Sequence, residues 1–122
     1  MPDSRRLFGT SIEKQVAQYL TAQGYRIFAH QFTTPFGEID LVCQDGNEVV
    51  FVEVKARTSS SYGYPEESVH AGKLRKIVRC AQVYLKTWPE DQPWRIDVIA
   101  VETKAGFHLT HLKAVDIPEA AW

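Results

Sequence analysis

The sequence predicts an α/β domain in which helices flank a mixed central sheet. Helical and strand-like periodicities follow one another in the order α-β-β-β-α-β, with one further strand near the C-terminus. Several strand segments are apolar on both faces, which is typical of a sheet covered on both sides. The 122 residues are enough for one core. We therefore expect a single domain over residues 1–122, with its core over about 9–112 and a short tail over 113–122.

The first expected element is an amphipathic helix over residues 10–23, which Gly24 ends. A strand over 25–32 follows, and a hairpin over 38–55 supplies two more strands around the turn signal Asp45-Gly46-Asn47. Residues 57–65 form a loop rich in serine and tyrosine. A long second helix comes next, and it ends near Trp88-Pro89. Its apolar stripe consists of Leu74, Ile77, Val78, Ala81 and Leu85. Residues 95–102 and 107–112 are the last expected strands.

Two short motifs carry the chemistry of this chain. The first motif is Gly37-Glu38-Ile39-Asp40. The second, Glu53-Val54-Lys55, begins 13 residues after Asp40. Residues two apart on a strand share a face. A loop of two residues, 46–47, or of four, 45–48, places Asp40 directly opposite Glu53, whereas a 45–46 loop makes them diagonal neighbours. In each case the two acids share a face, at roughly 5 to 8 Å between side-chain roots.

A Glu-x-Lys pair on a strand usually lies on a solvated face, where it forms a weak ion pair. Here Val49 and Phe51 share the face of Glu53, so the acid emerges at the end of a buried strand. Two carboxylates about 5 Å apart repel by roughly 3 kcal/mol at an effective dielectric near 20. A favourable cross-strand pair contributes only about 0.2–1 kcal/mol. Lys55 could offset part of this repulsion, but a divalent cation would offset it better.

The oxygen ligands, without a nearby His or Cys, favour a hard cation, Mg²⁺ or Mn²⁺. Asp40 and Glu53 would hold the ion, and the main-chain carbonyl of Val54 is a plausible further ligand. Lys55 would act beside the attacking water or the developing phosphate charge, as orienter, base or electrostatic stabiliser. The pattern predicts a metal site that acts on a phosphodiester.

Glu13 is the candidate for a third acid. It lies on the same helical face as the apolar residues at positions 16, 17 and 20. An alternative interpretation is a capping box with Thr10, in which Glu13 only returns to the helix backbone. The spacing leaves both open.

Positive charge is concentrated on the second helix, where no acid occurs between Gly72 and Trp88. Such a face is often merely solvated, but a local basic surface suits phosphate binding even in a chain of net charge −1. Tyr62 and Tyr64 in the preceding loop could stack on bases or simply pack. The candidate nucleic-acid-binding residues are Arg57, Lys73, Arg75, Lys76 and Arg79.

Composition and segment lengths predict a cytoplasmic protein. Apolar residues make up 44% of the chain, no apolar run approaches a membrane span, and the N-terminus lacks the apolar segment of a signal peptide. Cys43 and Cys80 are isolated and suggest free thiols in a reducing compartment.

The two motifs, together with Lys73, Ala81, Tyr84-Leu85 and Arg95-Ile96-Asp97-Val98, resemble those of the YraN family. These bacterial proteins are placed with the Holliday-junction-resolvase-like branch of the PD-(D/E)XK nuclease superfamily. The resemblance covers about residues 9–101. It implies a restriction-endonuclease-like fold and matches Glu13, Asp40, Glu53 and Lys55 to the catalytic positions. Ile39 stands where the superfamily pattern has proline, and His30-Gln31-Phe32 replaces a more usual Asn-x-Arg.

The expected function is a metal-dependent endonuclease that hydrolyses phosphodiester bonds in DNA, with branched or recombination intermediates as one substrate class. The alternative is a non-catalytic nucleic-acid- or partner-binding module that keeps the nuclease fold. Action on a two-fold symmetric junction would imply a homodimer. Asp97, next to Arg95, is interpreted as a structural acid rather than a metal ligand.

Overall fold

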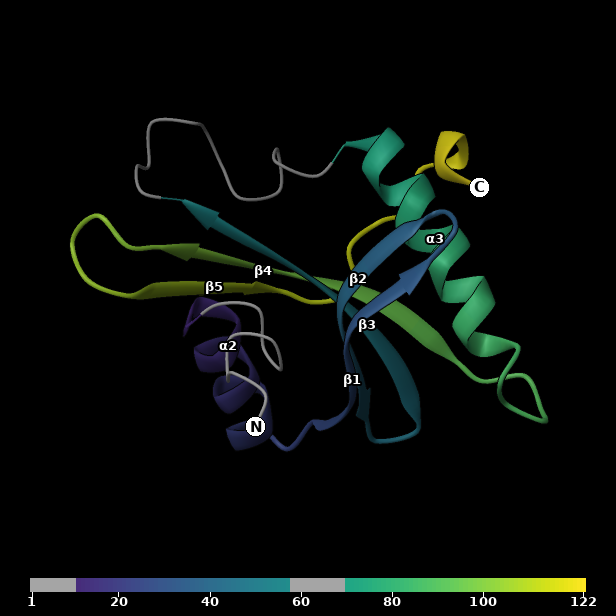
Figure 1. The fold of residues 1–122 in the computed structure, drawn as a ribbon, viewed down its shortest axis with the longest axis horizontal. Helices are drawn as coiled ribbons and strands as arrows, with labels where there is room; N and C mark the ends of the chain where they lie inside the picture. The colour runs from purple at the N-terminus through teal and green to yellow at the C-terminus, as the bar shows by residue number, and fades with distance from the viewer. Residues whose placement is uncertain (1–10, 58–69) are drawn as a thin grey trace.

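The computed structural model describes residues 11–57 and 70–122, in which a five-stranded mixed sheet packs with two helices (Figure 1). The strands lie side by side in the order in which they follow along the chain. All neighbours are antiparallel except β3 and β4, which are parallel. The strands are β1 (Arg26–Thr34), β2 (Gly37–Asp45), β3 (Glu48–Arg57), β4 (Trp94–Glu102) and β5 (His108–Leu112). The predicted α/β class and α-β-β-β-α-β order are confirmed.

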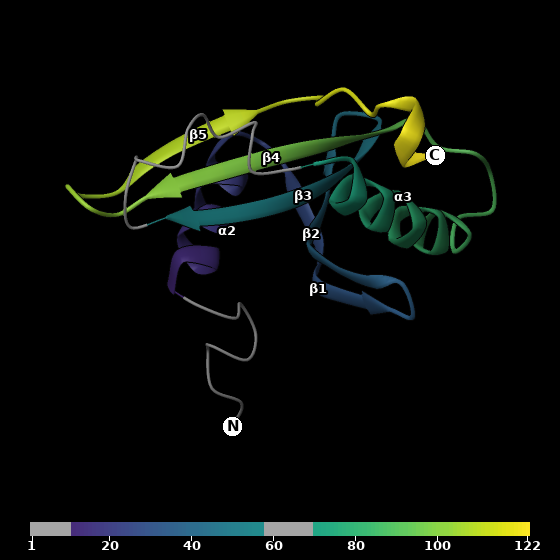
Figure 2. The ribbon, with the colours of Figure 1, turned by 90° about the horizontal axis from the view of Figure 1, so that it is seen from above.

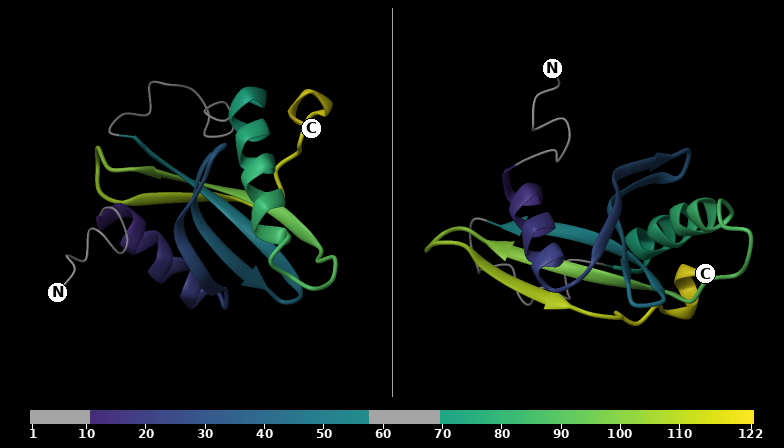
Figure 3. Two further views of the ribbon diagram at one scale, coloured as in Figure 1. Left: turned by 45° about the vertical axis from the view of Figure 1, so that its right-hand side comes forward. Right: turned by 90° about the horizontal axis from the view of Figure 1, so that it is seen from below.

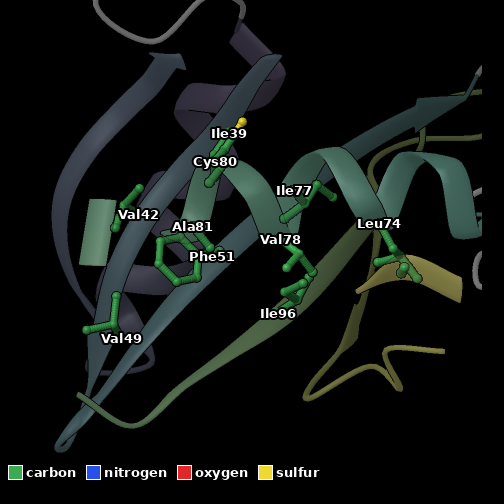
Figure 4. Close-up of a cluster of buried hydrophobic side chains, with 11 residues drawn as sticks. Ile39, Val42, Val49, Phe51, Leu74, Ile77, Val78, Cys80, Ala81 and Ile96 are labelled. Carbon is green, nitrogen blue, oxygen red and sulfur yellow. The ribbon is translucent and has the colours of Figure 1, made fainter. Parts of the chain in front are cut away.

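Helix α3 (Ala71–Leu85) lies on the crossover that the parallel β3–β4 pair requires. Its predicted apolar stripe faces the sheet, and Figure 4 shows four of its five side chains, Leu74, Ile77, Val78 and Ala81, between the helix and the strands. Phe51 of β3 is fully buried at the centre of this cluster, with ring contacts to Tyr84 and Trp94. The other buried members include Ile39, Val42, Val49, Leu74, Ile77, Val78, Cys80, Ala81 and Ile96.

Helix α2 (Ser11–Ala22) covers the opposite face of the central strands. Its buried residues at positions 16, 17 and 20 are those expected from the helical spacing, and Gly24, with φ +93°, follows its end. Val16 and Leu20 pack with Val50 and Val52, which alternate along β3 with Val49 and Phe51 on the α3 face. Both faces of β3 are therefore buried, as its continuous apolar run predicted. Figures 1 and 2 show α2 and α3 well apart, with strands of the sheet between them.

The turn between β2 and β3 fixes the register of the two motifs. Asp45 pairs with Glu48 and Gln44 with Val49, so the loop is the pair Gly46-Asn47. Gly46 has φ +61°, the positive value that the first position of a type II′ turn requires. Of the three loops considered from the sequence, this is the two-residue alternative that places Asp40 opposite Glu53.

The C-terminal residues pack on α3. After β5 the chain ends in a 3-10 turn, η2 (Glu119–Ala121), in which Ala121 is fully buried against the α3 cluster. The Arg75 guanidinium donates hydrogen bonds to the Ala120 carbonyl at 2.6 and 3.2 Å. Cys43 and Cys80 are both buried and free, as predicted. No helix in the described part of the chain is long and apolar enough to span a membrane. Tyr62 and Tyr64 lie outside the described residues.

Candidate functional site

The carboxylate of Asp40 terminates the ladder between β2 and β3. That ladder runs to the pair Leu41–Val52, and one residue further in the same register Asp40 lies across from Glu53. Here the Val54 N–H donates to Oδ2 of Asp40 at 2.7 Å. The side chain of Asp40 thus accepts a hydrogen bond from a main-chain amide of β3, and this contact fixes the carboxylate beside Glu53-Val54-Lys55. The structure brings the two predicted motifs together through this bond.

Glu53 is one of two buried charged residues in the described part of the chain, with 4% of its surface exposed. Two lysines approach the same oxygen, Oε1: Lys73 Nζ at 3.2 Å and Lys55 Nζ at 3.6 Å. The other oxygen, Oε2, is buried, and no donor among the described residues reaches it. A buried acceptor without a partner costs roughly 1–3 kcal/mol, more for a charged group. Oε2 is therefore an unused, charged acceptor inside the site, which suits a cation.

The electrostatics of Asp40 reflect this crowding. Burial, followed by the charge of Glu53, raises the pKa of Asp40 to about 6, although the Val54 amide and Lys73 act in the opposite direction. The nearby charge of Glu38 adds to the rise. Protonating Asp40 relieves the repulsion between the carboxylates, and a bound cation would relieve it in the same way. The acids in this cluster are thus held together at an electrostatic cost.

Glu13 reaches the edge of the same cluster from α2. Its pKa is raised by burial first and by the charge of Asp40 second. Gln31 Nε2 donates to its Oε2 at 3.4 Å. Thr10, the other half of the capping-box alternative, lies outside the described residues. Glu13 therefore lies within electrostatic reach of Asp40, on the inward face that the helical spacing predicted.

Gln31 is a residue that the sequence did not single out for the site. It has φ +49°, in the left-handed region that residues other than glycine rarely adopt. This conformation occurs within β1. The register of β1 against β2 shifts earlier in the strand, between Ile27 and Ala29. Backbone strain of this kind gathers at functional sites. The only sequence signal was the replacement of the usual Asn-x-Arg by His30-Gln31-Phe32.

The basic residues predicted to contact nucleic acid occupy different places. Lys73 lies in the carboxylate site, whereas Arg75 is bound to the C-terminal turn. Arg79 lies over the ring of Phe36, with its guanidinium carbon 5.8 Å from the ring centroid. Lys76 is exposed between these two positions on the helix. Arg57, the last residue of β3, accepts the Thr103 N–H with its carbonyl at 3.0 Å.

Asp97 lies on β4 in a second polar cluster. It is fully buried and accepts hydrogen bonds from Arg95 Nε at 3.0 Å, from the Tyr25 hydroxyl at 3.2 Å and from the Ala114 amide at 3.0 Å. Its Oδ2 is also 2.7 Å from His111 Nε2. The bonds from Arg95, Ala114 and His111 outweigh burial and lower the pKa of Asp97. Asp97 is thus a structural acid that ties β4 to β1 and β5, as its neighbour Arg95 suggested.

The donor set around Glu53 fits a hydrated hard cation better than a metal held by protein alone. No three His, Cys, Asp or Glu side chains in residues 11–57 and 70–122 are grouped so as to hold a metal. Mg²⁺ binds through one or two carboxylates and keeps several waters. Asp40 and Glu53, whose Oε2 has no donor in the part of the chain described, would provide those two carboxylates.

Comparison with known proteins gives the family of the chain. A family model described as "Uncharacterised protein family UPF0102" matches residues 12–101, which include both motifs. The chain belongs to the UPF0102 (YraN) family. A UPF0102 protein of Thermodesulfovibrio yellowstonii is 42% identical over 101 residues, which cover 83% of this chain and 90% of the relative. A second from Symbiobacterium thermophilum is 48% identical over 100 residues, 81% of this chain and 84% of the relative.

A third UPF0102 protein, from Persephonella marina, is 38% identical over 109 residues, 88% of this chain and 94% of its own length. The similarity to UPF0102 proteins spans α2 to β4, so it covers every element that supplies Glu13, Asp40, Glu53 and Lys73. Family membership is shown by these matches, and it agrees with the resemblance drawn from the motifs. The printed names of these relatives state no activity, so the chemistry is argued from the site.

Proposed function

We propose that the chain is a metal-dependent nuclease that hydrolyses phosphodiester bonds, with DNA as the expected substrate. The observation that carries this proposal is the state of Glu53: it is buried, lies opposite Asp40, is approached by two lysines at Oε1, and has no donor at Oε2 among the described residues. A purely structural carboxylate would have its acceptors satisfied, as those of Asp97 are. Glu53 instead keeps one oxygen available in a cluster that already repels negative charge.

Asp40, Glu53 and the Val54 carbonyl would hold Mg²⁺ or Mn²⁺. When bound, such an ion polarises a phosphate oxygen and lowers the pKa of a coordinated water. Asp40 is kept in place by the Val54 amide, so both carboxylates are oriented before a substrate arrives. This arrangement supports the proposed roles of Asp40, Glu53 and Val54.

The lysines supply the positive charge that the phosphate needs. Lys55 Nζ and Lys73 Nζ lie on the same side of Glu53 and point at the oxygen that a cation would leave free. Lys55 can orient the attacking water or stabilise the charge that develops on the phosphate. Lys73 attracts the incoming phosphodiester and lowers the pKa of Asp40, which favours its ionised form. Glu13 borders the site from α2, where it accepts a hydrogen bond from Gln31 of β1.

The test is cleavage of labelled linear duplex, single-stranded and four-way-junction DNA with Mg²⁺ or Mn²⁺. We expect Glu53→Ala and Lys55→Ala each to reduce the cleavage rate by more than about 100-fold, because each removes several kcal/mol of transition-state stabilisation. Glu90→Gln and Lys104→Ala remove one exposed charge each and serve as matched controls. They should cut like the wild type.

Wild-type protein that binds DNA but never cuts it, with either ion, would contradict the nuclease proposal and favour the binding-module alternative. Equal cutting by the wild type and Glu53→Ala would contradict the assignment of the activity to this site. Preference for the four-way junction would support a substrate with two-fold symmetry. In that case the reaction order in protein should reveal two cooperating copies.

A further inference from the structure

The turn between β1 and β2 exposes an aromatic ring next to the candidate site. Phe36 has 46% of its surface exposed, a large fraction for an apolar side chain of its size. The guanidinium of Arg79, on α3, lies over this ring at 5.8 Å from the centroid. An exposed ring paired with a planar cation is the surface on which a flat, electron-rich group stacks.

The turn holds Phe36 in one position. Its main-chain N–H donates to Thr34 Oγ1 at 3.0 Å, and the same hydroxyl lies 3.1 Å from Cys80 Sγ on α3. Gly37, with φ +141°, lies close to α3, because a Cβ added at this position would be 3.9 Å from Cys80 Sγ. Figure 2 and the right-hand view of Figure 3 both show this end of the hairpin on the α3 side of the molecule. The ring is therefore preorganised, so little conformational freedom is lost when a ligand stacks on it.

A basic stripe joins the ring to the carboxylates. Lys73, Lys76 and Arg79 follow one another at intervals of three residues on α3, which spans about 9 Å along the helix axis. Lys73 contacts Glu53 at one end, and Arg79 contacts Phe36 at the other. Along β2, Phe36 precedes Asp40 by four residues, or about 13 Å of extended chain. The ring is therefore a few nucleotides from the carboxylates, at the end of a row of cations.

We propose that Phe36 and Arg79 stack an unpaired base of a nucleic-acid strand whose phosphates follow Lys76 and Lys73 into the site. Aromatic rings that alternate with a positively charged track are the means by which proteins hold single strands. In an intact duplex both faces of an internal base are already stacked, so the ring gains a partner only where bases are unpaired. This inference rests on the proposed function and narrows its substrate to strands with single-stranded or unstacked nucleotides near the scissile phosphate.

The experiment measures binding without metal, so that it does not depend on cleavage. Fluorescence anisotropy in EDTA would follow the wild-type protein with a labelled 20-nucleotide single-stranded DNA, the RNA of the same sequence and the blunt DNA duplex. Phe36→Ala should weaken single-strand binding about tenfold and leave duplex binding unchanged. Phe36→Trp, which keeps an aromatic face, should bind at least as tightly as the wild type. Comparison of the affinities for the DNA and RNA strands shows whether binding at Phe36 and Arg79 prefers deoxyribose or ribose.

Two variants serve as controls. Phe107→Ala removes a ring of nearly equal exposure, 41%, from the connection between β4 and β5, and should change neither affinity. Arg79→Lys keeps the charge but removes the planar guanidinium, so single-strand binding should weaken about threefold while its salt dependence stays the same. Lys76→Ala should instead reduce the slope of log affinity against log salt by about 1. The melting temperature of each variant shows whether it is folded.

The stacking proposal is overturned if folded Phe36→Ala binds the single strand as tightly as the wild type, if it loses single-strand and duplex binding equally, or if the wild type binds no single strand. These results are separate from the test of hydrolysis. If the wild type cuts with Mn²⁺ and Phe36→Ala binds and cuts normally, the nuclease proposal stands and the stacking proposal is refuted. If the wild type never cuts and Phe36→Ala selectively loses single-strand binding, the stacking proposal is supported and the nuclease proposal is refuted.

Discussion

Replacement of Asp40 by asparagine should stabilise the metal-free protein at neutral and alkaline pH. Asparagine has the same shape, and its carbonyl oxygen can still accept the Val54 N–H that Oδ2 accepts at 2.7 Å. What it removes is a negative charge that burial and Glu53 disfavour. For most other hydrogen-bonded carboxylates, replacement by the neutral amide would lower stability. The sign of the change in the free energy of unfolding is therefore diagnostic.

The expected magnitude follows from the pKa of Asp40. That pKa is about 6 in the folded protein, against 3.8 for the free side chain. Because each pKa unit corresponds to about 1.4 kcal/mol, keeping Asp40 ionised costs the folded state up to about 3 kcal/mol. The Coulomb repulsion of two carboxylates about 5 Å apart is of the same order. Since Asp40 is partly exposed, we expect a stabilisation of about 1–3 kcal/mol for Asp40→Asn above pH 7.

The pH dependence gives the sign a second test. A carboxyl group whose pKa is raised on folding makes the folded state bind protons more tightly than the unfolded chain. This contribution therefore lowers wild-type stability as the pH rises from about 4 to about 6. The advantage of Asp40→Asn should be absent near pH 4, grow through this window and remain constant above it. Urea unfolding in EDTA at pH 4, 6 and 8 would measure it, with the exposed Asp91→Asn as the control.

Two results would refute this reasoning. If Asp40→Asn is less stable than the wild type at pH 8, Asp40 is not held at an electrostatic cost. If its advantage is the same at pH 4 and pH 8, the advantage does not come from the charge. Mn²⁺ extends the test, because a ligand that binds only the folded state at 100 times its Kd stabilises by about 2.7 kcal/mol. The ion should raise the melting temperature of the wild type, while Asp40→Asn should lose this response.

Three further predictions concern the residues around the site and the core. Lys73→Ala should reduce DNA cleavage at least tenfold with little loss of stability, whereas Arg75→Ala should leave cleavage unchanged and cost under about 1 kcal/mol, because of these two residues it is Lys73 that contacts Glu53. Asp97→Ala should lower the free energy of unfolding by about 3 kcal/mol at pH 7, since it leaves the guanidinium of Arg95 without its buried partner. This loss should shrink as the pH falls below about 4, because the carboxyl of Asp97 then binds a proton in the unfolded chain while its lowered pKa keeps it ionised in the folded protein. Phe51→Ala should cost about 3–5 kcal/mol in urea unfolding, because its ring fills the centre of the α3 cluster.

Much of the fold is encoded in short stretches of sequence. The helical spacing of the buried residues at positions 16, 17 and 20, and the apolar run from Val49 to Val52, each predicted a face and an element that the structure contains. The pairing of Asp40 with Glu53 was also within reach, because an even loop length places both acids on one face of the hairpin. The sequence left the choice among loops open, and Gly46-Asn47 is the loop observed.

The composition of the site depended on contacts between segments far apart in the chain. Lys73 and Arg75 are two residues apart on one helix, and their charges alone grouped them together. One meets Glu53 and the other the C-terminal turn, because α3 packs against both the sheet and that turn. Gln31 likewise reaches Glu13 only once β1 and α2 lie side by side. These contacts depend on how α3 and β1 pack on the sheet.

The sequence by itself determined the order of elements, the buried faces and the pair of acids, because each follows from a period of two or 3.6 residues within a short window. Only the tertiary structure decided which cations reach those acids and, within residues 11–57 and 70–122, which oxygen of Glu53 has no donor. The physical reason is that hydrogen bonds and ion pairs act over a few ångströms. Residues 20 apart in sequence, such as Glu53 and Lys73, meet only after the helix has packed on the sheet.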